Sequence, residues 1–341
     1  MSWYLGLTLV VLFAAGLLFL VLYAIVAIIQ EYRDDRVPVL LYHHFIPKAG
    51  VEKQGAINCD PVYACYDTAF DEQMAYLQKE GYAAISLDHF IAFQDGKKPL
   101  PPKPVILTFD DGFMSNYLYA FPILKKYGMT ATIFVTLDPG CENFRKYGSI
   151  DSPLTRDQIR EMSDYGISMQ SHTMTHRYLT ELDPKIVRWE LGQSKRDLER
   201  IVQKRVRFLA IPTGAYNRGV KRLVKEVGYK AAFCMLKGTN NSHSDRYALR
   251  RLVVARDFAI EDFQKLLKPA TACYLRITSL LQNVLFNTLL GPAKFDALRD
   301  RLYHTRVGSL LARAQLRYVA ACLAALMFCS LILGIVILVR S

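Results

Sequence analysis

The stretch PVILTFDDG, residues 104–112, decides the fold prediction. Its first six residues are apolar or β-branched, which indicates a buried strand, and Asp-Asp-Gly then ends the strand in a turn. Asp110 and Asp111 are adjacent carboxylates that repel each other, so one can bind a metal while the other stays free to accept a proton. Because Asp-Asp-Gly is also a common turn, this chemistry needs support from other parts of the chain.

Strands and helices alternate on both sides of this segment. We expect further strands at 37–42, 82–87, 130–136, 167–171, 207–211, 230–234 and 249–254. We expect helices at 70–80, 116–127, 155–165, 217–227 and 260–267, and a long helix that begins after Asp183. Residues 47–69 are expected to form a loop. Thr155 and Asp183 are the predicted helix caps. The alternation indicates parallel βαβ units, and about seven units in one domain favour a barrel over an open sheet. The predicted fold class is therefore α/β, a distorted (β/α)7-type barrel whose chemistry collects where the strands end.

Two other strand ends carry candidate functional residues. SHTMTH, residues 171–176, places His172 and His176 four positions apart, so both imidazoles can converge on one zinc or other late first-row divalent ion. AIPTGAYN, residues 210–217, contains Pro and Gly that shape a rigid turn, whose backbone N–H groups can face a developing oxyanion. Taken singly, the histidine pair is more often a surface or core feature, and the second segment is only a turn.

Together, in this order, the three segments resemble the polysaccharide deacetylase family, the group with the rhizobial chitooligosaccharide deacetylase homology domain. The resemblance covers residues 37–267, and PVLLYHH, residues 38–44, looks like the opening strand of the branch of biofilm poly-N-acetylglucosamine deacetylases. It implies a hydrolase that removes N-acetyl groups from an amino sugar and releases acetate and a free amine. It also implies one divalent metal ion, for which Zn2+ is the default and Co2+, Ni2+ or Fe2+ could use the same ligands.

The resemblance also assigns roles to individual residues. Asp111, His172 and His176 would hold the metal, and Asp110 would be the general base that takes a proton from metal-bound water. Thr213, with Tyr216 nearby, would contact the oxyanion and the substrate. Arg251 would orient the base, and Arg250 is the alternative for this role. His43 would protonate the leaving amine.

The sequence departs from the family pattern in two places. Ala210 stands where the family usually has an arginine, and the late Leu-x-x-His that usually supplies a general acid is missing. In the poly-N-acetylglucosamine branch the opening Tyr-His motif supplies this histidine instead, so His43 takes that role here. We expect the remaining histidines to be structural or on the surface: His44, His89, His243 and His304.

Both ends of the chain are apolar. No charged side chain occurs from Trp3 to Ile29 or from Tyr318 to Val339, and each run is long enough to span a bilayer as a helix. The predicted domains are a transmembrane helix at 1–30, the catalytic domain at 37–270, a basic amphipathic membrane-proximal segment at 271–317 and a transmembrane helix at 318–340. The alternatives are a cleaved signal peptide for the first run, a buried core helix for the second, and a helix packed on the barrel for the amphipathic segment.

Charge bears on the partners and on the membrane side. The net charge is +12, but basic residues crowd toward the second apolar run, which favours anionic lipid head groups over nucleic acid as the partner. Both predicted helices would span the cell membrane, and the Lys and Arg residues next to them lie mostly on the side of the domain. The positive-inside rule therefore favours a cytoplasmic domain, whereas the family resemblance favours an extracytoplasmic one. The substrate would be a polyprenyl-linked amino sugar in the first case and a polymeric amino-sugar glycan in the second. The rival functions are a deformylase of a lipid-linked amino sugar and an inactive membrane scaffold.

The seven cysteines include no CxxC pair, so a cysteine zinc site is not indicated. Free thiols are the default expectation. A local disulfide between Cys59 and Cys65 is the alternative if that region faces an oxidising space.

Overall fold

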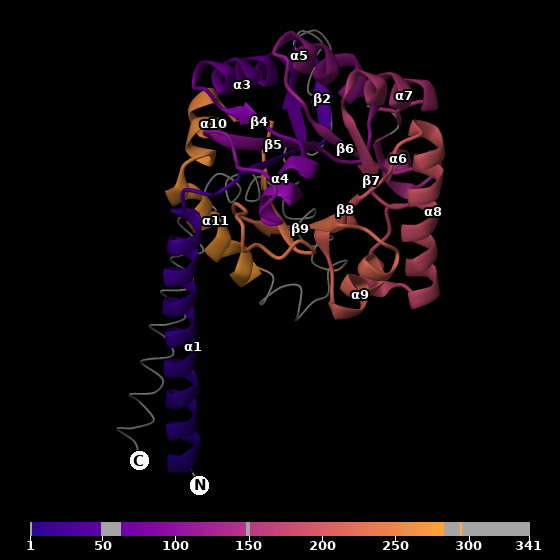
Figure 1. The fold of residues 1–341 in the computed structure, drawn as a ribbon. Coiled ribbons are helices and arrows are strands. Elements are labelled where there is room, and N and C mark those ends of the chain that lie inside the picture. Colours follow the sequence, from indigo (N-terminus) through magenta and orange to yellow (C-terminus); the bar gives the residue numbers. More distant parts are fainter. Residues whose placement is uncertain (1, 49–62, 148–150, 257, 283–293, 295–341) are drawn as a thin grey trace. The chain divides into compact units, whose positions relative to one another are not determined.

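The computed structural model describes residues 2–48, 63–147, 151–256, 258–282 and 294 of the 341-residue chain (Figure 1). The chain divides into two units. Gln30–Arg276 is one of them, and it contains the sheet and all of the candidate site residues. The other unit includes Met1–Ile29.

Parallel strands close into a barrel within the described part of Gln30–Arg276. Neighbouring strands follow the order β1-β10-β9-β8-β7-β6-β5, and β1 returns to pair with β5, with Val39 opposite Ile106. β4 (Ala83–Ala84) pairs with the start of β5 outside this ring. The predicted (β/α)7-type barrel is confirmed. Its strands are β1 (Val39–Tyr42), β5 (Pro104–Phe109), β6 (Thr132–Val135), β7 (Ser168–Ser171), β8 (Phe208–Ala210), β9 (Ala231–Lys237) and β10 (Leu249–Val253).

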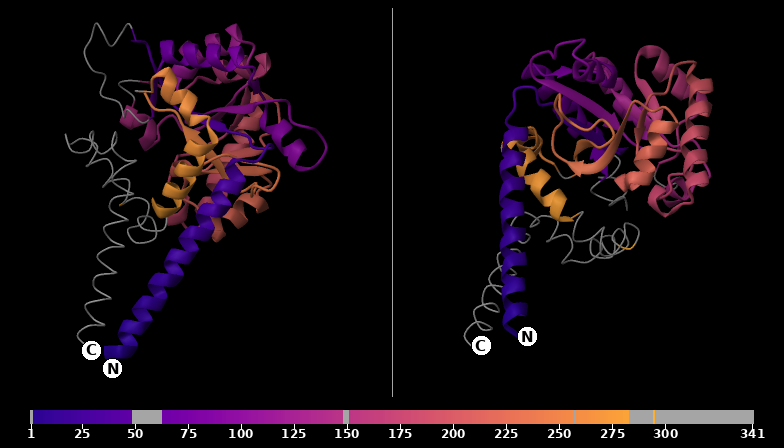
Figure 2. Two further views of the ribbon diagram at one scale, coloured as in Figure 1. Left: turned by 90° about the vertical axis from the view of Figure 1, so that its left-hand side faces the viewer. Right: turned by 60° about the horizontal axis from the view of Figure 1, so that its bottom comes forward.

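Buried apolar side chains explain the ring. β1, β5 and β6 are buried along their whole length, as expected for parallel strands whose outer faces are covered by helices. One core cluster joins Leu107 and Ile133 of the strands to Leu77, Leu124 and Leu191 of the helices. Figures 1 and 2 show the helices that carry these leucines, α3 (Asp67–Lys79), α5 (Phe121–Lys126) and α8 (Pro184–Val202), on the outside of the sheet.

Helices follow most of the strands. Both predicted caps are confirmed: the side chain of Thr155 accepts a hydrogen bond from Gln158 N in a capping box, and Asp183 caps a helix that starts with Pro184. The helices are α3 (Asp67–Lys79), α4 (Leu87–Gln94), α5 (Phe121–Lys126), α6 (Glu142–Tyr147), α7 (Arg156–Tyr165), α8 (Pro184–Val202), α9 (Arg218–Glu226), α10 (Ile260–Leu266) and α11 (Pro269–Gln282).

The region around α4 differs from the prediction. The strand expected over 82–87 is reduced to the two residues of β4. Ser86 then accepts a hydrogen bond from His89 N and begins α4, for which no helix was expected. An eight-residue helix is too short to show a clear hydrophobic period, so its cap decides where it begins.

Two more elements were wrong in the prediction. β2 (His44–Ile46) and β3 (Ala64–Tyr66) pair in parallel, and β3 lies where only a loop was expected. The helix expected over 116–127 begins as a π-helix, Asn116–Ala120, before α5. A single π turn depends on local packing and has no sequence period of its own.

α1 (Ser2–Glu31) is one continuous helix. Its segment Ala14–Glu31 has a mean hydropathy of 2.1 and is long and apolar enough to cross a membrane, a property that signal sequences and buried core helices share. α11 lies where the amphipathic segment was expected to begin. Apart from residue 294, the rest of that segment and the whole predicted span at 318–340 lie outside the described residues.

Candidate metal centre

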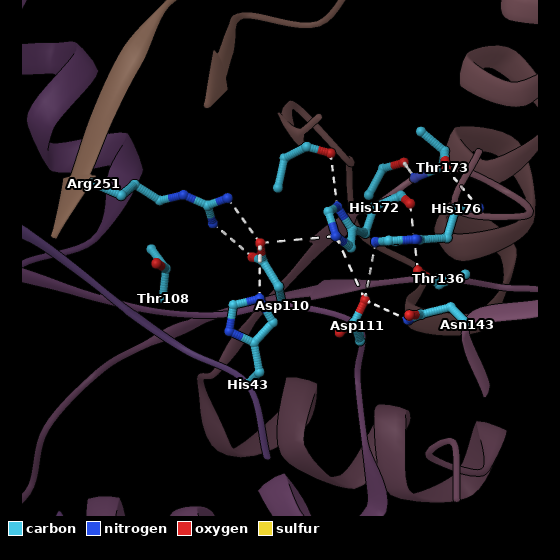
Figure 3. Close-up of polar contacts among 12 residues, drawn as sticks. His43, Thr108, Asp110, Asp111, Thr136, Asn143, His172, Thr173, His176 and Arg251 are labelled. Carbon is cyan, nitrogen blue, oxygen red and sulfur yellow. Dashed lines mark hydrogen bonds and ion pairs between the residues drawn. The ribbon is translucent and has the colours of Figure 1, made fainter. Parts of the chain in front are cut away.

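The ends of four strands bring predicted site residues together (Figure 3). Asp110 and Asp111 follow β5, His43 follows β1, His172 follows β7, and Arg251 lies on β10. These residues are far apart in the sequence, but parallel strands of a barrel end on one rim. The four residues other than His43 are almost completely buried, so their charges interact in a medium of low dielectric constant.

Three predicted ligands converge in a way that could hold a metal ion. The ligand atoms of Asp111, His172 and His176 lie within 4.8 Å of one another. Asp111 Oδ1 is 3.6 Å from His172 Nε2 and 3.4 Å from His176 Nε2. A carboxylate and two imidazoles form a donor set typical of catalytic zinc sites, which keep a further coordination position open.

The protonation states of the two histidines also fit a cation. His172 Nδ1 lies 2.8 Å from the carbonyl oxygen of Ala210. Because a carbonyl oxygen only accepts, Nδ1 must carry the hydrogen, and the lone pair is left on Nε2, which faces Asp111. Burial lowers the pKa of His172 and of His176, so both imidazoles are neutral, which is the form that binds metals.

Asp111 is held in a constrained position. Its φ is +70°, and Gly112 follows at +79°, where an added Cβ would meet Val135 Cγ1 at 3.2 Å. Asn143 Nδ2 donates a hydrogen bond to Asp111 Oδ1 at 2.9 Å. Burial, together with the charge of Asp110, raises the pKa of Asp111 well above its ordinary value. A buried pair of adjacent carboxyls in this state favours the binding of a cation.

Asp110 forms a bidentate ion pair with Arg251. Arg251 Nη1 and Nη2 donate to Asp110 Oδ1 and Oδ2 at 2.6 and 2.7 Å. Burial alone would raise the pKa of Asp110, but Arg251 and the nearby imidazoles outweigh it and bring that pKa to about 2. The alternative, Arg250, instead donates from Nη1 to the carbonyl oxygen of Lys237. Of the two arginines, Arg251 is therefore the one that contacts Asp110.

His43 reaches the same carboxylate. His43 Nε2 is 4.0 Å from Asp110 Oδ2, and the imidazole packs against Tyr63 with ring centroids 4.6 Å apart. Asn116 Nδ2 donates to the carbonyl oxygen of His43 at 2.7 Å, which fixes its backbone. Burial lowers the pKa of His43 to about 3, so the imidazole is neutral at pH 7. Its Nδ1 atom is buried and has no hydrogen-bond partner among the described residues.

Thr213 and Tyr216 lie in the segment that follows β8. Thr213 sits in a short 3-10 turn, Pro212–Gly214, with a φ of +56°, which is unusual for a β-branched residue. Its hydroxyl is buried, and no residue in the described ranges forms a hydrogen bond with it. Burial raises the pKa of the half-buried Tyr216 to about 12. The oxyanion and substrate roles of both residues stay predictions.

Two residues that the sequence analysis missed support the site. Asn143 in α6 contacts Asp111, and Glu190 in α8 accepts hydrogen bonds from the loop between His172 and His176. Neither residue belongs to a motif. Glu190 is one of several charged residues in a long polar helix, so nothing in the sequence distinguished it.

Of the histidines expected to be structural or on the surface, His44 and His89 have structural contacts and His243 is exposed. His44 is buried, with Nδ1 3.1 Å from Asp151 Oδ2 and its ring stacked on Phe113. His89 Nε2 lies 2.8 Å from the carbonyl oxygen of Pro99. His304 lies outside the described residues, as does Cys59, the proposed partner of Cys65. The thiol of Cys65 is buried and free.

Comparison with known proteins gives the family. The family model described as Polysaccharide deacetylase matches residues 97–232. A putative polysaccharide deacetylase of Bacillus subtilis, YxkH, is 30% identical over 228 residues, which cover 67% of this chain and 74% of that protein. The chain belongs to the polysaccharide deacetylase family.

Two further relatives place this polysaccharide deacetylase more closely. The poly-beta-1,6-N-acetyl-D-glucosamine N-deacetylase of Staphylococcus epidermidis is 28% identical over 205 residues, 57% of this chain and 69% of that protein. The solved structure of the Streptococcus pyogenes deacetylase PplD in complex with acetate is 27% identical with a TM-score of 0.60, and the match covers 70% of this chain and all of that one. The predicted resemblance is thus confirmed.

Proposed function

We propose that this polysaccharide deacetylase is a metal-dependent hydrolase that removes N-acetyl groups from an amino sugar. One observation carries the proposal: Asp110 and Asp111 are adjacent but have different partners. Asp110 is paired with Arg251 and has His172 Nε2 3.8 Å away, while Asp111 lies 3.6 and 3.4 Å from the Nε2 atoms of His172 and His176. When the surroundings of two carboxyls drive their pKa values apart, one of them can accept a proton while the other binds a metal ion.

Asp111, His172 and His176 would hold one divalent ion, for which Zn2+ is the first choice and Co2+, Ni2+ or Fe2+ are alternatives. Such an ion supplies Lewis-acid polarisation of the acyl oxygen and makes a coordinated water more acidic. Asp111 is kept in place by the hydrogen bond from Asn143, and His172 by the carbonyl of Ala210. These contacts fix the direction of the ligand atoms before an ion arrives.

Asp110 and His43 would carry the protons. Arg251 orients the ionised Asp110 carboxylate, which accepts a proton as water adds to the acyl carbon. The carbon–nitrogen bond then breaks, acetate forms, and the amine leaves with a proton. His43 is assigned as its donor, because His43 Nε2 is 4.0 Å from Asp110 Oδ2 and a neutral imidazole can take up the proton that Asp110 received.

The substrate class follows from the relatives. The named Staphylococcus epidermidis relative acts on poly-beta-1,6-N-acetyl-D-glucosamine, and the named Streptococcus pyogenes relative was solved with acetate. These names support an N-acetylated amino-sugar glycan as the substrate and acetate as the product. A polyprenyl-linked amino sugar carries the same acetamide group and is the second substrate to be tested.

Acyl release by detergent-purified, zinc-loaded protein tests the function. The substrates are a β-1,6-linked N-acetylglucosamine oligomer, a polyprenyl-linked N-acetyl amino sugar and the N-formyl counterpart of the second. We expect acetate and free amine in equal amounts from at least one N-acetyl substrate. Release of formate alone would replace the deacetylase by a deformylase. No release from any substrate by protein that also binds no metal would favour the inactive scaffold.

We further propose that α1 anchors the catalytic unit to a membrane. Large apolar side chains are about half exposed or more along the helix, among them Leu18 (59%), Phe19 (56%) and Ile29 (58%). Such a surface is stable in a lipid environment rather than in water. Tyr32, exposed at the end of the helix, suits the interface with the head groups. A second span at 318–340 stays a prediction, and so does the side of the membrane on which the catalytic unit lies. Reporter fusions after residue 276 would test that side.

The end of α1 supports an anchor that is retained rather than cleaved. Glu31, its last residue, is completely buried and belongs to the catalytic unit. Its carboxylate accepts hydrogen bonds from Thr239 N at 3.1 Å and from Thr239 Oγ1 at 2.5 Å. Arg276 Nη1 donates to it at 2.8 Å. Gly238 leaves room for this contact, because an added Cβ there would lie 2.7 Å from Glu31 Oε1.

Replacing Glu31 with Ala is expected to lower the free energy of unfolding of the catalytic unit by about 3–5 kcal/mol. The change breaks a buried ion pair and takes an acceptor from Thr239 N–H. Urea unfolding of the detergent-solubilised chain measures the effect. Asp34→Ala, which removes an exposed acid from the next turn, is the matched control. Equal losses in the two variants would contradict the role of the buried junction.

A further inference from the structure

Glu190 is a buried carboxylate that the proposed mechanism does not use. It lies in the middle of the 19-residue helix α8 and is completely buried. Among the described residues, no Lys, Arg or His forms an ion pair with it. A buried anion without a counterion is costly unless hydrogen bonds satisfy its oxygens. The hydrogen bonds of Glu190 therefore indicate what it is for.

Within the described part of the chain, the hydrogen bonds of the Glu190 carboxylate all lead to the loop that carries His172 and His176. Glu190 Oε2 accepts from Met174 N and from Thr175 N, both at 2.9 Å. Glu190 Oε1 makes a further hydrogen bond with the Thr175 hydroxyl. Met174 and Thr175 stand between His172 and His176, so the carboxylate holds the middle of the metal-binding loop.

A second side chain of α8 holds the start of the same loop. Ser194 lies four residues after Glu190, on the same face of the helix. Ser194 Oγ is 2.9 Å from Ser171 Oγ, and Thr173 N donates to Ser171 Oγ at 3.2 Å. Glu190 and Ser194 therefore fasten the loop to α8 on both sides of His172.

The loop needs this support because its backbone is unfavourable. Thr173 has a φ of +69° and His176 a φ of +57°, in a region that residues other than glycine rarely adopt. His176 N donates to Thr173 Oγ1 at 3.2 Å. The ring of His172 is held by the carbonyl of Ala210, whereas the contacts of the His176 ring are with Asp111 and His172, the other two residues of the site.

We propose that Glu190 is a positioning residue for the metal centre, acting through the backbone of Met174 and Thr175 to keep His176 at the right distance from Asp111. This inference rests on the proposed metal-dependent function. Glu190 does not touch the ion or the substrate. Its three hydrogen bonds select the strained loop conformation before the ion binds, so ion affinity should depend on them.

The chain offers variants that separate this role from a merely structural one. In Glu190→Gln the amide oxygen can accept from both backbone N–H groups, and the NH2 group can face the Thr175 hydroxyl. In Glu190→Leu no acceptor remains. Glu199→Leu is the matched control, because Glu199 is on the same helix and Glu199 Oε1 likewise accepts from a backbone group, Val206 N, at 3.0 Å, but away from the histidine loop.

The experiment measures Zn2+ affinity of the full chain by competition with a chelating dye, and the visible absorption spectrum of Co2+-loaded protein. Both are recorded at a temperature where circular dichroism shows every variant to be folded. We expect Glu190→Leu to weaken Zn2+ binding about 10–100-fold and to change the Co2+ spectrum. Glu190→Gln should stay within about threefold of the parent chain, and Glu199→Leu should bind with unchanged affinity even if it unfolds more easily.

Unchanged Zn2+ affinity in folded Glu190→Leu would overturn the inference, and so would equal weakening by Glu199→Leu. In both cases the metal-dependent function would stand, because the parent chain binds the ion. A parent chain that binds neither Zn2+ nor Co2+ would overturn the metal-dependent function and this inference with it.

Discussion

Replacing Asp110 with Asn is expected to lower kcat/KM for deacetylation by about 10²–10⁴-fold. Asparagine has nearly the same shape as aspartate but cannot accept the proton of the attacking water. The proposed metal ligands Asp111, His172 and His176 are not changed, so bound Zn2+ should remain near the parent stoichiometry. Acetate release by the zinc-loaded variant, with metal content measured on the same sample, checks both expectations.

The same substitution also disturbs a buried ion pair. Arg251 is 3% exposed and donates two hydrogen bonds to Asp110, so Asp110→Asn leaves its charge without a buried anion. A loss of about 3–5 kcal/mol of stability should accompany the loss of activity. Combining Asp110→Asn with Arg251→Met removes the charge as well, and should recover stability but not activity. Activity above about a tenth of the parent value in folded single and double variants would exclude Asp110 as the base.

The pH dependence of stability gives a separate measure of this pair. Burial alone would raise the pKa of Asp110, but Arg251 and the imidazoles lower it from 3.8 to about 2. A carboxyl with a lower pKa in the folded state stabilises that state above its unfolded pKa, and the stabilisation is lost as pH falls from about 4 toward 2. Urea unfolding at several pH values should therefore show a shallower acid limb for Asp110→Asn than for the parent chain.

Replacing His172 with Ala is expected to remove tight binding of the divalent ion and to lower deacetylation by about 10²–10⁴-fold. A Lewis acid contributes several kcal/mol to such a reaction, and each 1.36 kcal/mol corresponds to a factor of ten. His172 supplies one of three converging ligand atoms, and its Nε2 is directed by the contact of Nδ1 with Ala210. Metal analysis after gel filtration and acetate release at saturating Zn2+ measure the two effects.

Chelation supplies the companion experiment. A strong chelator should inactivate the parent chain, and added Zn2+ should restore its activity but not that of His172→Ala. His89→Ala is the matched control, because the ring of His89 contacts the carbonyl of Pro99 and His89 lies outside the group that could hold a metal ion. Full activity of the parent chain with its metal removed, or normal metal content in His172→Ala, would refute the assignment of these ligands.

The barrel could be predicted because its signals are local. A short apolar run closed by a turn, such as Pro104–Phe109, favours a strand buried on both faces, and repeated alternation with helices leaves few topologies. The caps at Thr155 and Asp183 are local as well, since each side chain bonds to a backbone group two or three residues away. α4 was missed because eight residues are too few to show a hydrophobic period, and the π turn because it has no sequence period of its own. β3 was missed because its place depends on pairing with β2, about 20 residues earlier in the chain.

The choice between Arg250 and Arg251 illustrates what sequence could not decide. Alternation along a strand sends adjacent side chains to opposite faces, but it does not say which face is the interior. The pairing of β10 with β9 also shifts register between Leu249 and Arg251, which breaks simple counting. Only the closed ring shows that Arg251 faces Asp110 and that Arg250 turns to Lys237.

The sequence by itself determined the barrel and the chemical identity of the central residues: a carboxylate pair at one strand end, and a histidine pair at another. Short-range constraints suffice for that, because the strand, the turn and the spacing are all contained in a few consecutive residues. Tertiary structure alone decided which groups support them. Asn143 meets Asp111, and Glu190 holds the histidine loop, because packing brings α6 and α8 to the rim of the barrel. A side chain that acts through a hydrogen bond to a distant backbone leaves no pattern in its own segment.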